Sequence, residues 1–215
     1  MERLAVFDRH HAARDLAPLD ELSTLDTAVY RAVATVPTPS LDRAMARLSD
    51  AANHSKPWLA TAAVLAAIGG RRGREAALLG VASIGVTSFV NNVVVKQLLP
   101  RRRPDRTGAT VPEERWVRMP TSRSFPSGHS AAAFAFAASV GTTLPRLSFP
   151  LHLAATAVAY SRVHTGVHYP GDTIAGALLG TTAAAATRHA FTRTATGRRY
   201  LGDAPAEANR RARSA

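Results

Sequence analysis

The sequence predicts an all-α protein whose helices form a membrane-embedded bundle. Three observations lead to this fold class. First, apolar runs recur through the middle of the 215-residue chain. Second, none of these runs alternates apolar and polar residues as a half-buried β-strand does. Third, basic segments with Pro and Gly separate the runs. Ala, Gly and Thr dominate the later runs, and small residues let helices approach closely in a bilayer. The mean hydropathy of −0.05 conceals this pattern because polar ends dilute an apolar middle.

The N-terminal part predicts two amphipathic helices behind a polar arm. Residues 1–24 are mixed and polar. Residues 25–36 show the apolar spacing of a helix, which Pro37 and Pro39 would end. Residues 40–52 carry a second pattern of this kind. Neither segment is apolar enough to face lipid on all sides, so neither is counted as a membrane span.

Five apolar runs follow in the sequence and predict about five spans. The longest exceeds the roughly 20 residues needed to cross the hydrocarbon core, whereas the last three are short for spans. Gly176 and Gly180 in the final run have the GxxxG spacing of closely packed helices. A soluble core rich in Ala is the alternative interpretation of these small residues. The runs are residues 57–70, 76–99, 130–144, 149–160 and 173–187.

The formal net charge is +12, and nearly all of the positive groups are Arg, since Lys56 and Lys96 are the only lysines. A balance this basic suits nucleic acid, anionic lipid headgroups or phosphorylated substrates. The Arg residues lie mainly in loops between apolar runs and in the tail, which is typical of membrane proteins rather than of nucleic-acid-binding ones. We therefore expect an anionic membrane surface as a partner and no nucleic acid. The chain has no Cys, which excludes disulfides and thiolate metal sites.

Three short polar runs stand at the edges of the apolar segments, and the first and third supply cations. Lys96 and Arg103 belong to residues 96–104, and Arg162 belongs to residues 161–172. A phosphomonoester is a dianion, so its transfer needs charge neutralisation, and the planar fork of Arg donates two parallel bonds to phosphate oxygens. We expect these three side chains to bind phosphate. For any one of them alone, contact with lipid headgroups is the competing interpretation.

The second run, Pro126-Ser127-Gly128-His129, precedes an apolar helix. Ser127 is suited to cap that helix, and Gly128 lets backbone N–H groups come close to an anion. Helix N-termini bind anions through their dipole and their unpaired donors. His129 just inside the helix would face the same anion and could protonate a leaving oxygen. A plain N-cap turn is the alternative interpretation.

In the third run, His168 and Asp172 are four residues apart, and Pro170 between them suits the first turn of a helix. This spacing puts the carboxylate within reach of the imidazole. There it would fix the tautomer and stabilise the cation that forms when the histidine attacks phosphorus. A non-catalytic pair at a helix start is the alternative interpretation. His164 fits no role in this scheme and is expected to be structural.

The histidines do not form a metal-binding motif. The chain lacks HExxH, and no cluster of three His, Asp or Glu ligands is evident. The positive groups expected around the site would also oppose a divalent cation. We therefore expect neither a catalytic metal nor any other cofactor.

Together the three runs match the patterns K-x6-RP, PSGH and SR-x5-H-x3-D without a gap or substitution over residues 96–172. In this order and spacing the chain resembles the type 2 phosphatidic acid phosphatase superfamily, whose motif set vanadium haloperoxidases also resemble. The resemblance implies a helical catalytic domain over residues 25–190, between the polar arm of residues 1–24 and a basic tail of residues 191–215. It also implies a metal-independent reaction through a phosphohistidine. The implied roles are His168 as nucleophile, Asp172 as its partner and His129 as general acid, with Lys96, Arg103, Ser127, Gly128 and Arg162 around the phosphate.

The resemblance and the apolar runs together predict an integral membrane phosphatase similar to compact actinobacterial members. The expected substrate is a lipid phosphomonoester or diphosphate: a polyprenyl phosphate or diphosphate, a prenyl-linked sugar phosphate, phosphatidate or phosphatidylglycerophosphate. Two alternatives stay open, a soluble acid phosphatase or vanadium-dependent haloperoxidase with the same site, and a non-catalytic basic membrane scaffold. A homo-oligomer is compatible with the sequence. Membrane members generally carry six spans, and here the first is missing or replaced by residues 25–52.

The basic loops also predict an orientation in the membrane. The positive-inside rule places Arg71, Arg72 and Arg74 on the cytoplasmic side, which puts all three polar runs on the outer face. The loop of residues 100–125 holds many further Arg residues against this rule, and we interpret part of their charge as functional. The N-terminus lacks the pattern of a cleaved signal peptide. We expect a plasma-membrane protein whose active site faces the extracytoplasmic side.

Overall fold

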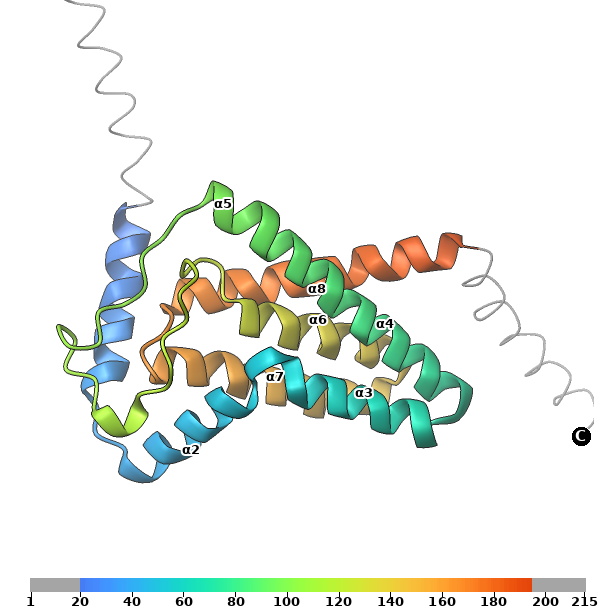
Figure 1. Ribbon diagram of the computed structural model, residues 1–215, viewed down its shortest axis with the longest axis horizontal. Coiled ribbons are helices and arrows are strands. Elements are labelled where there is room, and N and C mark those ends of the chain that lie inside the picture. Colours follow the sequence, from blue (N-terminus) through green and yellow to red (C-terminus); the bar gives the residue numbers. More distant parts are fainter. Residues whose placement is uncertain (1–19, 195–215) are drawn as a thin grey trace, which may run out of the picture.

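The computed structural model describes residues 20–194, and this range contains helices and loops but no β-strand (Figure 1). The all-α prediction is confirmed. Residues 20–24, which the sequence placed in the polar arm, already belong to the first helix, since Leu22 and Leu25 extend its apolar positions. The tail predicted at residues 191–215 lies outside the described residues except for its first four. The α-helices are residues 20–35, α2 (Pro39–Ala51), α3 (Lys56–Ile68), α4 (Gly70–Phe89), α5 (Lys96–Leu98), α6 (Gly128–Thr143), α7 (Ser148–His164) and α8 (Pro170–Arg193).

One continuous rod consists of α4, a π-helical segment (Val90–Val95) and α5. It runs over Gly70–Leu98, 29 residues, and within the described part of the chain it is the one helix long and apolar enough to cross a membrane. The predicted run of residues 76–99 lies almost wholly inside it. The spans predicted for the shorter apolar runs stay predictions.

Helix α6 lies at the centre of the bundle, against α4, α7 and α8 (Figure 1). Its approach to α8 is close because glycines of α8 face it. A Cβ at Gly176 would lie 2.5 Å from the carbonyl oxygen of Ser127, and one at Gly180 would lie 2.1 Å from that of Ala131. The GxxxG spacing therefore marks a tight helix–helix contact, as the sequence predicted.

The bundle has small residues inside and large apolar residues outside. Ala is the commonest residue of the main core cluster, and Trp58 and Phe136 are among its few large members. By contrast, Ile68 is 81% exposed and Phe149 is 77% exposed, and many other Leu, Val and Ile side chains are also exposed. Water-soluble folds place large apolar side chains inside and rarely expose extensive apolar surface. The outer surface of this bundle therefore suits an apolar environment.

Inward-pointing Arg side chains anchor the long loop between α5 and α6, residues 99–127. Arg115 is fully buried, and its Nε donates to Asp42 Oδ1 at 2.8 Å. Its Nη2 donates to the carbonyl oxygen of Val36, just after the first helix, where the negative end of the helix dipole attracts a cation. Arg106 is buried in the same loop. Part of the Arg charge that conflicted with the positive-inside rule is therefore used inside the fold.

Replacing Gly180 by Ala would place a methyl group against the backbone of α6, so α8 would have to move away. We expect Gly180→Ala to lower the free energy of unfolding by about 1–3 kcal/mol, the usual range for overpacking. Gly85→Ala is the matched control, because a Cβ at Gly85 meets no atom within 4 Å. That control should gain up to about 1 kcal/mol, since Ala favours helix over Gly. Denaturant unfolding of the purified proteins measures both values, and equal stability of the two variants would contradict the close packing.

Candidate active site

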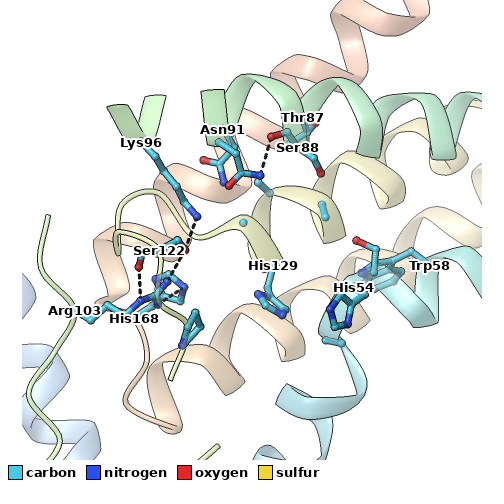
Figure 2. Close-up of a pocket in the computed structure, with 17 residues that line it drawn as sticks. His54, Trp58, Thr87, Ser88, Asn91, Lys96, Arg103, Ser122, His129 and His168 are labelled. Atoms are coloured by element: carbon cyan, nitrogen blue, oxygen red, sulfur yellow. Dashed lines mark hydrogen bonds between the residues drawn. The ribbon is translucent and has the colours of Figure 1, made fainter. Parts of the chain in front are cut away.

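The three polar runs meet at one end of the bundle, around a cavity of about 200 Å³ (Figure 2). Lys96 comes from the end of the α4–α5 rod, and Arg103 comes from the long loop. Gly128 and His129 form the start of α6, and His168 lies in the loop between α7 and α8. All five residues line the cavity, so the fold brings together segments that are up to 72 positions apart in the sequence, from Lys96 to His168.

His168 is held between a carboxylate and a cation. The side chain is 2% exposed, with Nδ1 3.3 Å from Asp172 Oδ2 and Nε2 3.1 Å from Arg103 Nη1. Because guanidinium can only donate, Nε2 must be the accepting nitrogen, and Nδ1 carries the proton that Asp172 accepts. The Nε2 lone pair is the one that a nucleophile needs. Burial, together with the Arg103 charge, lowers the pKa of His168 to about 4, although Asp172 opposes this shift. The imidazole is therefore neutral at pH 7.

Asp172 collects hydrogen bonds from several elements. Its Oδ2 accepts from the Ser124 hydroxyl and, at 3.0 Å, from the backbone N–H of Tyr169, while its Oδ1 accepts from Arg101 Nη1 at 2.9 Å. The carboxyl is fully buried in the first turn of α8. Burial by itself raises the pKa of Asp172, but the hydrogen bonds from His168 and Ser124 and the Arg101 charge outweigh it and hold the pKa below its usual value. The group therefore stays ionised beside His168.

Arg101 has a place in the site that the sequence did not reveal, since its spacing favoured Arg103. Arg101 Nη1 lies 2.9 Å from Asp172 Oδ1 and 2.7 Å from Asp26 Oδ2, and its guanidinium covers the ring of Tyr169 at 4.1 Å. Asp26 also accepts a 2.7 Å hydrogen bond from the N–H of Gly171. The first helix, the long loop and the start of α8 are thereby tied together at the carboxylate of Asp172.

Arg103 and Lys96 present positive charge to the cavity on a common support. Arg103 Nε donates to the carbonyl oxygen of Ser122 at 2.8 Å, and Lys96 Nζ donates to the Ser122 hydroxyl at 3.1 Å. A further Arg103 bond, from Nη1 to the carbonyl oxygen of Val167 at 2.8 Å, fixes the fork beside His168. Burial lowers the pKa of Arg103 to about 10, against the opposing influence of Asp172. A bound anion would relieve this crowding of buried cations.

The start of α6 has the form predicted for an anion-binding turn. Ser127 is its N-cap, with Oγ accepting from the N–H of Ser130 at 3.4 Å, and Gly128 lies on the cavity wall. His129 Nε2 lies 2.9 Å from Asn53 Oδ1, an amide oxygen that only accepts, so Nε2 carries a proton and Nδ1 is free for proton transfer. Burial and the neighbouring cations lower the pKa of His129 to about 3. A phosphate dianion in the cavity would raise the pKa of His129.

Two predicted phosphate ligands, Ser127 and Arg162, do not line the cavity. Ser127 caps α6, and Arg162 bonds to α2. Arg162 is buried, its Nη1 donates to the hydroxyl and the carbonyl oxygen of Ser49, and its Nε has no hydrogen-bond partner among the described residues. Its carbonyl oxygen accepts from the N–H of His168 at 3.1 Å, so the residue also supports the loop that carries His168. His164 is structural, as predicted, because its Nε2 lies 2.9 Å from Asp42 Oδ1 away from the cavity.

Within residues 20–194, no three His, Cys, Asp or Glu side chains are grouped so that they could hold a metal ion. The cavity wall carries imidazole, guanidinium and ammonium groups, from His129, His168, Arg103 and Lys96. Such a set can neutralise a phosphoryl group and offer it a nucleophile.

The model of the family described as the PAP2 superfamily matches residues 76–195, more than half of the chain. The chain belongs to the PAP2 superfamily. It is therefore a phosphoric ester hydrolase by family, and its three polar runs all lie inside the matched segment.

Relatives of this PAP2 protein are named as phosphatases of lipid phosphates. Decaprenylphosphoryl-5-phosphoribose phosphatase of Mycobacterium tuberculosis is 33% identical over 173 residues, covering 79% of this chain and 89% of the relative. Undecaprenyl-diphosphatase of Sulfolobus acidocaldarius is 37% identical over 97 residues, 45% of this chain and 44% of the relative. The mycobacterial relative bears out the expected likeness to actinobacterial members.

Two solved structures have the same fold as this PAP2 protein. Aquifex aeolicus LpxE aligns with a TM-score of 0.60 and 24% identity over 76% of this chain and 94% of the other. A PAP2 type phosphatidylglycerolphosphate phosphatase from Bacillus subtilis, described as transmembrane, aligns with a TM-score of 0.60 and 24% identity over 79% of this chain and 85% of the other.

The contacts of Arg101 predict a positioning role in catalysis. Removing its charge in Arg101→Gln takes a cation away from the buried Asp172, so the pKa of Asp172 rises. An ionised Asp172 accepts the Nδ1 proton of His168 and so leaves the Nε2 lone pair free. If His168 acts through that lone pair, kcat should fall roughly tenfold or more, the cost of a lost hydrogen bond to a buried charge. The pH below which activity is lost should also move upward.

Arg102→Gln is the matched control, since Arg102 is the exposed neighbour in the same Arg triplet. It removes the same charge from the same loop and should leave both kcat and the acid limb of the pH profile close to wild type. Steady-state rates between pH 4 and 8 compare the three proteins. Identical profiles for the two variants would exclude a positioning role for Arg101.

Proposed function

We propose that this PAP2 protein is a metal-independent phosphatase that releases phosphate from a membrane lipid through a phosphohistidine on His168. One observation carries the proposal: a buried, neutral imidazole, fixed by Asp172, directs its unprotonated Nε2 toward Arg103 in a cavity with cationic walls. Phosphoryl transfer depends mainly on positioning and on neutralising charge. This arrangement supplies both, together with the nucleophile.

In the first step, Nε2 of His168 forms a bond to phosphorus while the bond from phosphorus to the leaving oxygen breaks. The charge that develops on the imidazole faces Asp172, which stays ionised for the reasons given above. Lys96 and Arg103 neutralise the equatorial phosphoryl oxygens, and the N–H groups at the start of α6 donate from another side. Binding of the dianion raises the pKa of His129, which takes up a proton from solvent at Nδ1 and gives that proton to the leaving oxygen.

In the second step, His129 returns to the role of base. It takes a proton from a water molecule whose oxygen attacks phosphorus, and the bond between phosphorus and Nε2 breaks. Inorganic phosphate leaves, and His168 regains its lone pair. The same residue thus serves as acid and then as base, which restores the starting protonation state after each turnover.

We infer that the enzyme acts within a membrane. The rod of α4 and α5 is long and apolar enough to span one, and the exposed Leu, Ile, Val and Phe side chains of the bundle need an apolar surrounding. The interior made of Ala and Gly is that of helices packed in lipid. These features favour a lipid phosphatase over a soluble acid phosphatase or haloperoxidase, and the close contacts around His168 favour catalysis over a scaffold role.

The orientation proposed from the basic loops agrees with the position of the Arg residues at the end of the bundle opposite the cavity. Arg71, Arg72 and Arg74 lie at the start of α4, roughly 40 Å along the rod from Lys96. The C-terminal part of α8 lies at the same end as the turn between α3 and α4, opposite the long loop (Figure 1). We therefore propose that this Arg-rich end is cytoplasmic, that the membrane is the plasma membrane and that the cavity opens on the extracytoplasmic side.

The substrate is proposed to be a polyprenyl phosphate or diphosphate, a prenyl-linked sugar phosphate, phosphatidate or phosphatidylglycerophosphate. The names of the relatives, which refer to prenyl-linked phosphoribose and to undecaprenyl diphosphate, support the prenyl members of this set. A panel of these lipids with the purified protein in detergent is the direct test of substrate class.

The role of His168 predicts that His168→Ala loses activity by about 1,000-fold or more, as removal of a catalytic nucleophile does. Wild type should release phosphate at the same rate with and without EDTA. His189→Ala is the matched control and should keep wild-type rates, because His189 is exposed on α8 far from the cavity. Activity abolished by EDTA, or retained in His168→Ala, would refute the mechanism.

The role of His129 predicts a dependence on the leaving group. In His129→Ala the first step with an alkyl phosphate should be slow, because an alkoxide needs a proton to leave, whereas p-nitrophenolate leaves without one. With p-nitrophenyl phosphate the second step, which needs the base, should become limiting. We expect a burst of about one equivalent of p-nitrophenolate per enzyme, followed by slow turnover. Equal losses for both substrates without a burst would contradict the acid–base assignment.

A further inference from the structure

One wall of the cavity carries buried polar groups that the mechanism does not use. Thr87 and Asn91 of the α4–α5 rod both line the cavity, and each is only 1% exposed. The Thr87 hydroxyl and both polar atoms of the Asn91 amide make no hydrogen bond within the described part of the chain. Buried donors and acceptors without partners destabilise a fold, so groups of this kind usually serve another purpose.

The π-helical segment explains why Asn91 and Lys96 face the same cavity. In an α-helix, residues five apart point in directions that differ by about 140°, given 3.6 residues per turn. A π-helix forms i→i+5 hydrogen bonds, so its residues five apart lie nearly above one another, and π segments are frequent at functional sites. Thr87 is four residues before Asn91 and shares its face. Figure 2 shows Lys96, Asn91 and Thr87 in sequence along this rod, opposite His168 and His129.

The Asn91 amide lies next to the expected phosphate position. A Cβ at Gly128 would be 3.2 Å from Asn91 Nδ2, so this amide adjoins the start of α6, whose N–H groups face an anion. The part of a substrate that Asn91 binds would therefore be the part that directly carries the phosphate. It would lie on the side of the cavity away from Arg103, toward Thr87 and Trp58.

The chemistry of this wall selects the kind of group it would bind. Among the residues that the structure describes, Lys96 and Arg103 are the only Lys or Arg residues that line the cavity, and no Asp or Glu lines it. A second phosphate beside Asn91 would need further cations, and a hydrocarbon chain would leave the amide unpaired. Hydroxyl groups both donate and accept, as the amide of Asn91 and the hydroxyl of Thr87 do. A neutral group with several hydroxyls therefore matches the wall.

We propose that Asn91 and Thr87 form a subsite for the hydroxyl groups of a sugar or polyol that carries the phosphate to be removed. The inference rests on the proposed function, and it narrows the substrate to lipids whose terminal phosphate sits on a hydroxyl-bearing carbon skeleton. A phosphate attached directly to a hydrocarbon chain would leave the subsite unused. A site built to bond hydroxyls discriminates strongly against analogues that lack them.

The test compares two substrates that differ only in hydroxyl groups, an alkyl riboside 5-phosphate and its 2,3-dideoxy analogue. Wild type should have a kcat/KM at least tenfold higher for the hydroxylated compound. In Asn91→Leu, whose side chain has nearly the same size, this ratio should fall to within about twofold of one. Gln97→Leu is the matched control and should keep the wild-type ratio, because Gln97 is exposed on the same rod, does not line the cavity, and its amide already donates to the Asn92 carbonyl oxygen at 3.4 Å.

Thermal unfolding separates a binding role of Asn91 from a structural one. Replacing an unpartnered buried amide by an apolar side chain of similar size should raise the unfolding temperature of Asn91→Leu. A lower unfolding temperature with an unchanged substrate ratio would make Asn91 structural and overturn the proposal. Equal kcat/KM of wild type for both substrates would overturn the subsite while leaving the phosphatase function intact. Phosphate release from neither substrate would overturn the subsite if the enzyme still hydrolyses phosphatidate or a polyprenyl phosphate, and would refute the proposed function if it hydrolyses none of these lipids.

Discussion

The ionised carboxylate of Asp172, buried at the start of α8, is the interaction on which the active site depends. It orients His168, it accepts from Ser124 and Arg101 of the long loop, and the carbonyl oxygen of the same residue accepts from the N–H of Ser127. One residue thereby fixes the imidazole of His168 and joins the start of α6 to the start of α8. Because a buried carboxylate is stable only when its oxygens are fully paired, any shift of these elements would be opposed by the cost of an unpaired charge.

Burial of the cations near this carboxylate costs free energy, and a bound phosphoryl dianion would offset that cost. Arg103 and Arg162 lose hydration on burial, and burial is the largest influence that lowers the pKa of each to about 10. A phosphoryl dianion supplies the missing negative charge, and a transition state with charge spread over the equatorial oxygens uses it most fully. Since the side chains are already fixed by backbone carbonyl groups, little reorganisation is needed when the charge develops.

The sequence predicted the parts of the site that depend on local spacing. The four-residue separation of His168 and Asp172, the N-cap at Ser127 and the close packing at Gly176 all follow from helix geometry. The partners of Arg101, Arg162 and His129 could not be predicted, because Asp26, Ser49 and Asn53 lie far away in the sequence and have no pattern of their own. Nor did the apolar run of residues 76–99 reveal its π-helical segment, since that distortion changes the direction of side chains without changing the hydrophobic pattern.

The N-terminal part of the chain contributes hydrogen-bond partners to site residues, so the functional unit begins before the segment that carries the motifs. Asp26, Ser49 and Asn53 all precede the segment that the PAP2 family model matches, residues 76–195. A fragment cut at residue 76 would keep every signature residue and still lack the side chains that brace Arg101, Arg162 and His129. The start of the segment matched by the family model is therefore not the start of the structural unit that holds the site, and any grafting or truncation has to keep the earlier helices.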